Sequence, residues 1–280
     1  RAPEPVASSA PAMASRPLVS VVIPVCNDAA RLGRCLDALA AQTWPREAIE
    51  IVVVDDGSGD DPAAVCHGRS GVTLIRQARA GSNQARNRAL EVARGVILAC
   101  TDADCLPAPG WIEAGVRCLE AAPRAGLVAG HVEMFAADPA HVTAVEWVDI
   151  FAGFDQRRCA ELLHFGATAN TFTTRAVMEA LGPFDASLES GADMEWGQRA
   201  WRADWTVLYC PDAIVAHPTR TSWSALWART SRVARGQHTL ATRHGIGRAG
   251  LWFSAATLLR LPVRTAVHLA RDPRIPGPSR

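Results

Sequence analysis

The stretch LVSVVIPVCNDAARLGRCLDALAAQTWPREAIEIVVVDDGSGD, residues 18–60, decides the fold of this chain. Its two β-branched runs, 18–25 and 49–54, are typical of strands buried on both faces of a parallel sheet. Between them, Leu32, Leu36 and Leu39 recur at helical spacing and predict a helix over 29–41. The stretch therefore predicts a strand, a helix and a second parallel strand in succession.

The same alternation continues along the chain. We expect strands at 72–75 and 96–100 and helices at 84–94 and 110–121. Strands that alternate with helices predict an α/β, Rossmann-like fold with a doubly wound, mostly parallel sheet. Further on, the pattern predicts a strand near 164–171, helices from 175 and over 194–202, strands at 206–209 and 213–215, and helix beyond 223.

The charge balance argues against a nucleic-acid partner. Lys and Arg number 29 and Asp and Glu 28 among 280 residues, a formal net charge of +1 at pH 7. No global field therefore attracts a polyanion. The eight cysteines include no C-x-x-C pair, so we expect them to be reduced and the protein to be cytoplasmic.

The two ends of the chain differ from its middle. Residues 1–17 are rich in Pro, Ala and Ser and predict a disordered tail before a domain over 18–220. Residues 221–280 predict a helical C-terminal extension, in which apolar residues that include Trp252, Phe253 and Leu259 are interleaved with Arg248, Arg260 and Arg264. This mix suits contact with a membrane surface, here its inner face, and a helix that packs on the domain explains it as well.

Two carboxylates one residue apart follow the predicted strand at 96–100. Asp102 and Asp104 of the TDAD segment cannot both be core side chains, and an extended backbone would place them on one face, with Ala103 between them. Hard oxygen ligands suit Mg²⁺ or Mn²⁺ that holds a diphosphate and stabilises its departure. The alternative is a solvated turn that caps the next helix, and the position at a strand end favours the metal.

Further positions fit a bound nucleotide or its metal. Asp55 and Asp56 end the second strand, where carboxylates accept hydrogen bonds from a base or a ribose, although an Asp-Gly turn explains them too. Arg86 lies at a helix start, where it can meet a phosphate or stay solvated. His217 follows a predicted strand and is either a third metal ligand or a hydrogen-bonded histidine. A GxGxxG motif is absent, which removes the main support for a dinucleotide-binding dehydrogenase.

A second acidic cluster, GADMEW at 191–196, lies at a predicted helix start. An inverting transfer needs a carboxylate that deprotonates the acceptor hydroxyl; Asp193 is our first choice for this base and Glu195 the rival. The alternative reading makes Asp193 an N-cap and Glu195 a favourable charge at the helix dipole. Trp196 belongs to a group of indoles that could stack on an acceptor sugar, although most large aromatics are core residues.

Four segments together resemble the inverting family 2 glycosyltransferases of the GT-A fold. They are VSVVIPVCNDAARLGRCLDALAAQTWP, IEIVVVDDGSGD, GSNQARNRALEVARGVILACTDADCLP and GADMEWGQRAWRA, and the similarity covers roughly 18–220. The resemblance implies a metal-dependent transfer of a sugar from a nucleotide diphosphate, with a UDP-sugar favoured, to an acceptor hydroxyl. The acceptor stays open among a lipid-linked molecule, a glycan, a peptide and a small molecule.

The resemblance also implies roles for single residues. The residue before Asp193 is Ala192, where family members have Glu, so the choice between Asp193 and Glu195 stays open. The implied roles are Pro24 and Val25 lining the nucleotide pocket, Asp56 contacting the base, Arg86 near the diphosphate, Asp102 and Asp104 holding Mn²⁺ or Mg²⁺, Asp193 as the base, and Asn170 in the acceptor pocket.

The absence of one motif distinguishes this chain from the processive members of the family it resembles. Their Gln-x-x-Arg-Trp signature is absent because Gln198, Arg199 and Trp201 have the wrong spacing, which favours a single transfer. Two other functions stay open. A nucleotidyltransferase normally needs a Gly-rich loop that PVCNDAARLG lacks, and an inactive scaffold of this fold would bind a glycan or a partner.

Overall fold

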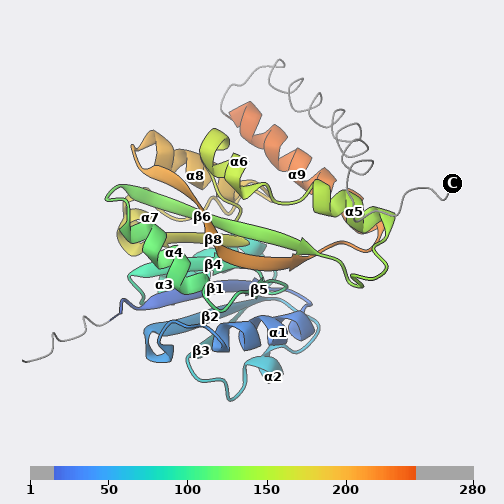
Figure 1. Cartoon of the computed structure of the whole chain (residues 1–280), viewed down its shortest axis with the longest axis horizontal. Helices are drawn as coiled ribbons and strands as arrows, with labels where there is room; N and C mark the ends of the chain where they lie inside the picture. Colours follow the sequence, from blue (N-terminus) through green and yellow to red (C-terminus); the bar gives the residue numbers. More distant parts are fainter. Residues whose placement is uncertain (1–15, 244–280) are drawn as a thin grey trace, which may run out of the picture.

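In the computed structural model, which describes residues 16–243, eight strands form one sheet in the order β3-β2-β1-β4-β7-β6-β8-β5 (Figure 1). The first four strands pair in parallel, which confirms the parallel half expected from the sequence. Both β1 and β2 are buried along nearly all of their length, as their apolar runs require. The four are β1 (Val19–Val25), β2 (Ile49–Asp56), β3 (Val72–Gln77) and β4 (Ile97–Thr101).

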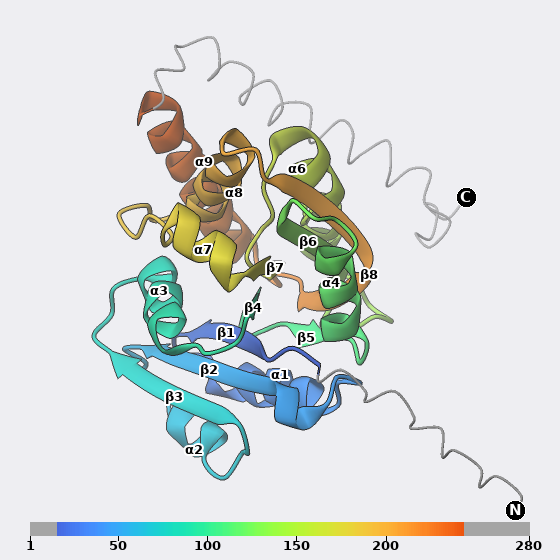
Figure 2. The ribbon, with the colours of Figure 1, turned by 90° about the vertical axis from the view of Figure 1, so that its left-hand side faces the viewer.

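Helices cover both faces of this sheet (Figure 2), and the sheet separates the core into two clusters, one on each face. Alternate residues of β1 reach opposite clusters, since Val21 shares one with Leu36 and Val22 shares the other with Ala89. One face carries α1 (Ala29–Ala40), the 3-10 helix η1 (Arg46–Ala48), α2 (Pro62–Cys66) and α4 (Trp111–Glu120). The other carries α3 (Ser82–Val92), α7 (Arg175–Leu181) and α8 (Ala192–Arg202).

The second half of the sheet is mixed. Strand β7 is antiparallel to both β4 and β6, and β8 is parallel to β6 and antiparallel to the short β5. The sheet is therefore parallel in most of its pairs and mixed around β7. These strands are β5 (Leu106–Pro107), β6 (Ala125–Phe135), β7 (Asn170–Thr174) and β8 (Thr206–Pro218).

Several elements of this half differ from the sequence prediction. The two strands expected at 206–209 and 213–215 are one strand, β8, whose register with β6 shifts next to Gly130. The strand expected near 164–171 begins only at Asn170, because a helix precedes it and ends at His164 in the left-handed conformation. The sequence analysis missed that helix, α6 (Gln156–Leu163), as well as α5 (Ala144–Phe151) and β6.

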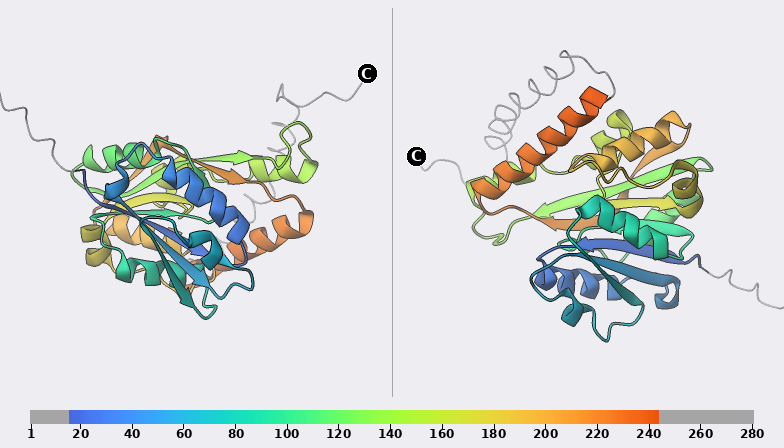
Figure 3. Two further views of the ribbon diagram at one scale, coloured as in Figure 1. Left: turned by 90° about the horizontal axis from the view of Figure 1, so that it is seen from below. Right: turned by 180° about the vertical axis from the view of Figure 1, so that it is seen from behind.

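The described chain ends in α9 (Trp223–Arg243), which runs along one side of the molecule from α5 toward the loop before α8 (Figures 1 and 3). Arg243 holds its end by pairing with Asp185 at 2.7 Å. Near the same end, a Cβ at Gly236 would lie 2.3 Å from the carbonyl oxygen of Ser190, so only glycine allows this close approach. Helix α9 is thus fixed against the loop that leads into α8.

Two sequence predictions concern residues beyond this range. Most of the tail predicted over 1–17, and all of the apolar and basic segment that includes Trp252 and Phe253, lie outside the described residues. Within 16–243, no helix has both the length and the apolar character that crossing a bilayer requires.

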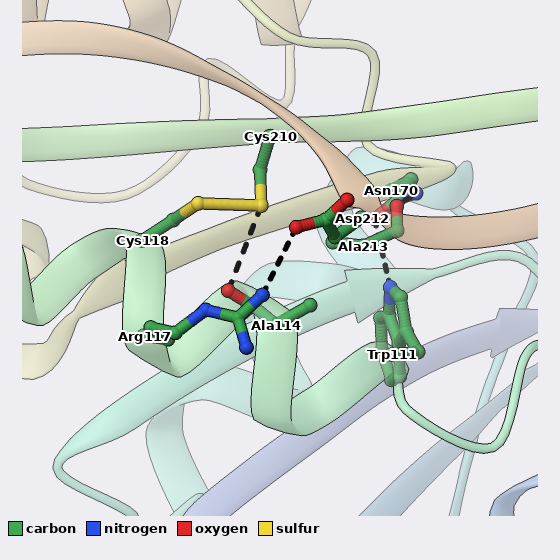
Figure 4. Close-up of a disulfide and its surroundings, with 8 residues drawn as sticks. All are labelled: Trp111, Ala114, Arg117, Cys118, Asn170, Cys210, Asp212 and Ala213. Carbon is green, nitrogen blue, oxygen red and sulfur yellow. Dashed lines mark hydrogen bonds and ion pairs between the residues drawn. A yellow bond between two sulfur atoms is a disulfide. The ribbon is translucent and has the colours of Figure 1, made fainter.

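Two cysteines correct the expectation that all eight are reduced. Cys118 of α4 and Cys210 of β8 form a disulfide, with their Cα atoms 6.4 Å apart (Figure 4). The bond joins positions 92 residues apart and ties α4 to the sheet. Spacing gave no sign of it, because the two cysteines meet only in the folded chain. The cytoplasmic location rested on reduced cysteines and stays a prediction.

Candidate active site

A cavity of about 560 Å³ opens at the carboxyl ends of the parallel strands. Residues at the ends of β1 and β2 and after β4 form one side of it, and the loop before α8 together with α9 forms another. This is the position at which open α/β sheets bind ligands. Of the residues singled out from the sequence, Pro24, Val25, Asp56, Arg86, Asp102, Ala103, Asp104, Asp193 and His217 line the cavity.

Four side chains with metal-ligating atoms meet here, and all but Cys105 line the cavity. Such atoms of Asp102, Asp104, Cys105 and His217 all lie within 4.8 Å of one another. The two aspartates do not face the same side through extended backbone, as we expected, but through a turn in which the Cys105 N–H donates to the Asp102 carbonyl at 3.1 Å. The sequence did not single out Cys105, whose thiol is fully buried.

The environment of this cluster suits a cation. Burial raises the pKa of Asp104, and the negative charge of Asp102 adds to the effect although His217 opposes it. His217 Nδ1 lies 2.8 Å from the Pro218 carbonyl oxygen. Because a carbonyl only accepts, Nδ1 keeps its proton, which leaves Nε2, 3.7 Å from an Asp104 oxygen, as the nitrogen available to a metal.

Arg86 of α3 lies next to the acidic cluster. Its Nη2 donates to Asp102 Oδ1 at 2.5 Å, and the side chain is 6% exposed. Its Nε is buried without a hydrogen-bond partner among the described residues. An N–H in this state costs about 1–3 kcal/mol, so an acceptor brought by a ligand would stabilise the site.

Asp56 is fixed at another edge of the cavity. Its carboxylate accepts hydrogen bonds from Gln77 Nε2 at 2.8 Å and from the backbone N–H groups of Ala80 and Gly81 at 2.7 and 2.8 Å. These donors orient the side chain at the start of α3. A carboxylate offers about four acceptor positions, so one is left for a ligand.

Of the two candidate bases, Asp193 lines the cavity and Glu195 does not. Asp193 Oδ1 accepts the N–H of Met194 at 2.9 Å, and burial raises the pKa of its carboxyl. Glu195 instead binds Arg199 through both of its oxygens, at 3.1 and 2.7 Å. The N-cap of α8 is Gly191, so Asp193 does not serve as the cap.

Two further predicted residues lie outside the cavity lining, which corrects their expected placement. Asp55 accepts the N–H of Ser58 at 2.9 Å and lies 3.3 Å from the Arg76 guanidinium, on the far side of its strand end from Asp56. Trp196 is 1% exposed, and its indole N–H donates to the Gly182 carbonyl at 2.9 Å. Its ring belongs to the core, which is the alternative reading for a large aromatic.

Asn170 is likewise a core residue and not an acceptor contact. Its Oδ1 accepts the indole N–H of Trp111, and its Nδ2 donates to the carbonyls of His131 and Ala213, all at 2.8 Å. These bonds join α4, β6, β7 and β8. Every polar atom of the fully buried side chain is satisfied within the protein, which leaves none for a substrate.

Several cavity residues were not found from the sequence. Arg229 and Arg232 are three positions apart in a predicted helix and so share a face, which was the available signal. The remaining ones lie in loops, where no periodicity marks them. The set is Phe154, Glu189, Arg220, Arg229 and Arg232.

Comparison with known proteins assigns the chain to a protein family. The family model described as Glycosyl transferase family 2 matches residues 20–182. The chain is 35% identical over 226 residues to glycosyltransferase AglE of Haloferax volcanii, an alignment that covers 79% of this chain and 73% of that protein.

Solved structures share the fold. The mannosyltransferase PcManGT from Pyrobaculum calidifontis, in complex with GDP-Man and Mn²⁺, matches with a TM-score of 0.67 and 22% identity over 91% of this chain and 75% of that chain. GalNAc-T7, with UDP, GalNAc and Mn²⁺, matches with a TM-score of 0.59 and 21% identity over 74% of this chain and 44% of that chain. At these identities the likeness establishes the fold, which is the GT-A fold expected from the resemblance.

Proposed function

We propose that this protein moves a sugar from a nucleotide-diphosphate donor to an acceptor hydroxyl with inversion at the anomeric carbon. The proposal starts from the family of the chain, which belongs to glycosyl transferase family 2 and is a glycosyltransferase. The reaction is metal-dependent and non-processive. The observation that carries the proposal is a single cavity that holds both the cluster of Asp102, Asp104 and His217 and the carboxylate of Asp193.

The residues of the cluster fit Mn²⁺ or Mg²⁺. Asp102 and Asp104 would hold the ion through hard oxygens and His217 through Nε2, while the Pro218 carbonyl orients the imidazole from behind. A cation would relieve the repulsion between the two carboxylates that contributes to the raised pKa of Asp104. When bound, the ion would stabilise the negative charge that develops on the departing diphosphate. Two solved structures of the same fold contain Mn²⁺.

The charge of the cavity lining supports the same proposal. Six carboxylates and five guanidinium groups line the cavity, an excess of one formal negative charge among its Asp, Glu and Arg side chains. A divalent cation reverses that sign. The lining then favours a diphosphate, whose oxygens could also satisfy the free Nε of Arg86.

Asp193 is the proposed base. The acceptor oxygen attacks the anomeric carbon while its proton passes to the Asp193 carboxylate, and the bond from that carbon to the diphosphate oxygen breaks with its electron pair on the diphosphate. The raised pKa makes Asp193 a stronger base than an ordinary aspartate. Glu195 is held by Arg199, and we assign it the structural task of fixing α8.

The nucleotide would lie between Asp56 and the acidic cluster, against Pro24, Val25 and Ala103. A UDP-sugar is the donor that the family resemblance favours, and GDP-Man, as bound by PcManGT, is the first competitor. The acceptor stays open. The proposed location is the cytoplasm, and the redox state of Cys118 in intact cells tests it, because a reducing compartment would keep that thiol free.

Isothermal titration of UDP, GDP and dTDP with Mn²⁺, and again with EDTA, tests the proposal. We expect Mn²⁺-dependent binding of one nucleotide, weakened at least about tenfold in Asp104→Asn. Asp212→Asn is the matched control, since Asp212 pairs with exposed Arg117 away from the cavity. Binding of no nucleotide, or binding that ignores both the metal and Asp104, would overturn the metal-dependent mechanism.

A further inference from the structure

One side of the cavity is formed by arginines that the proposed mechanism does not use. Arg229 and Arg232 come from α9, and Arg220 comes from the segment between β8 and α9. All three lie beyond residues 20–182, the part matched by the family model. They add positive charge where the strand ends contribute carboxylates.

Arg220 is held in place by a buried counter-charge. Its Nη1 lies 3.0 Å from Asp149 Oδ2, and its backbone N–H donates to the same oxygen at 2.9 Å. Asp149 has no exposed surface. Beside it, the Thr219 hydroxyl donates to Glu146 at 3.2 Å, so the segment that precedes α9 is anchored twice to α5.

Arg229 has no carboxylate of its own. It is half-buried, its guanidinium carbon lies 5.3 Å from the centre of the Phe154 ring, and no ion pair among residues 16–243 includes it or Arg232. Burial lowers the pKa of Arg229, and the neighbouring charge of Arg220 lowers it further, against the effect of Asp149. Asp149 thus acts on both Arg220 and Arg229, while the charge of Arg232 adds to the repulsion at Arg229, which leaves the group short of negative charge.

This basic group lies close to the acidic cluster. The ring of Phe154 that Arg229 covers also packs against the ring of His217, with the two centroids 5.0 Å apart. An anion held by Arg229 would therefore lie within the same cavity as the proposed metal, separated from His217 by little more than one aromatic ring.

We propose that Arg220, Arg229 and Arg232 form an anion subsite that binds a phosphate group of one of the two substrates. The identity of those substrates rests on the proposed function, but phosphate binding itself does not. Guanidinium groups present paired N–H donors that match two phosphate oxygens, and three of them can surround one phosphate. The phosphate belongs either to the diphosphate of the donor or to a phosphorylated acceptor.

Calorimetry with simple phosphates on the full chain tests the subsite. Phenyl phosphate and pyrophosphate are titrated in EDTA, where the carboxylates of the acidic cluster repel them and the arginines alone attract them. We expect binding to the wild type, weakened at least about tenfold in Arg229→Gln and in Arg232→Gln. Arg117→Gln is the matched control, because this exposed arginine of α4 pairs with Asp212 and does not line the cavity.

A second titration, of the nucleoside diphosphate with Mn²⁺, identifies the source of the phosphate. Weaker nucleotide binding in Arg229→Gln assigns the subsite to the donor, and unchanged nucleotide binding with loss of phenyl phosphate binding assigns it to the acceptor. Both results support the subsite. Equal affinity of the variants and the wild type for both simple phosphates, or no binding to the wild type, would overturn it.

The two proposals fail separately. If the wild type binds no nucleotide with Mn²⁺ but its phosphate binding depends on Arg229, the proposed function falls and the subsite stands. Thermal unfolding of each variant verifies that it is folded. If Arg229→Gln is not folded, exposed Arg232 carries the test, since its replacement leaves no buried gap.

Discussion

Replacing Glu146 with Gln tests how the structure beneath α9 is held together. Glu146 lies in the first turn of α5 and is 2% exposed. Its carboxylate accepts four hydrogen bonds: from the N–H of Ala137 at 2.9 Å, from the N–H and hydroxyl of Thr143 at 2.9 and 2.7 Å, and from the hydroxyl of Thr219 at 3.2 Å. One side chain thus joins the start of α5, the loop before it and the segment that leads to α9.

The size of the effect follows from these donors. Led by the backbone N–H of Thr143, they lower the pKa of Glu146 from 4.5 to about 2, against the opposing effect of burial. That difference corresponds to about 3 kcal/mol in favour of the ionised carboxylate in the folded state. Gln keeps one acceptor oxygen and turns an NH₂ group toward the remaining donors. We expect the free energy of unfolding to fall by about 2–3 kcal/mol at pH 7.

Urea denaturation from pH 7 to pH 3 measures this effect. The pKa in the folded state is below that in the unfolded state, so the stabilisation is complete above about pH 4.5 and is lost as the pH falls toward 2. The difference between wild type and Glu146→Gln should therefore shrink in acid. Glu120→Gln, at an exposed position that ends α4, is the control. A loss below about 0.5 kcal/mol at pH 7, within the usual range for surface substitutions, would refute the reasoning.

Three further predictions concern the site and its support. Asp193→Asn should lower kcat by about 10²–10⁴ without weakening nucleotide binding, whereas Glu195→Gln should leave kcat nearly unchanged; the reverse pattern would make Glu195 the base. The affinity for Mn²⁺ should fall as the pH is lowered, because Asp104 must lose its proton to bind the ion. Since the pKa of Asp104 is raised, this fall should begin at a pH above the usual pKa range of an aspartate. Mn²⁺ titrations at several pH values test this, and an affinity that does not change with pH would mean that Asp104 is not a ligand. Asn170→Ala should lower the free energy of unfolding by at least about 2 kcal/mol, since it leaves the Trp111 indole N–H and two carbonyls unpaired. A variant of normal stability that no longer binds nucleotide would instead show that Asn170 belongs to the binding site.

The parallel half of the fold could be predicted because its strands are continuous apolar runs, as in β1 and β2. Strand β6 could not, because its sequence AGLVAGHVEMF contains two glycines, which weaken a strand pattern. The structure shows why glycine is required at both positions, Gly126 and Gly130. A Cβ at Gly126 would lie 2.4 Å from the Cβ of Trp205, and one at Gly130 would lie 2.3 Å from Asn170 Oδ1. Contacts between residues far apart in the chain thus fix these glycines, and a single sequence does not display such contacts.

The residues of the candidate site also fall into those that could be predicted from the sequence and those that could not. Asp56, Asp104 and Asp193 follow strand ends or begin a helix, and those positions alone direct them to one edge of the sheet. Asn170 and Trp196 are polar or aromatic residues near that edge, and only the structure shows that their polar atoms are already bonded inside the protein. Whether each turns toward the cavity or into the core depends on its packing partners.

The attachment of α9 has a consequence for how this enzyme can change. The helix is held by the close approach of Gly236 to Ser190, by the ion pairs of Arg235 with Glu189 and Arg243 with Asp185, and by buried Leu226 and Leu240. It lies beyond residues 20–182, which the family model matches. Arg229 and Arg232 belong neither to the acidic cluster nor to the sheet. The arginines on this side of the cavity thus lie on a different element from Asp102 and Asp104 and can be exchanged separately from them. A chimera that carries α9 of a relative on this body is a direct way to alter what the cavity accepts while the chemistry of transfer is retained.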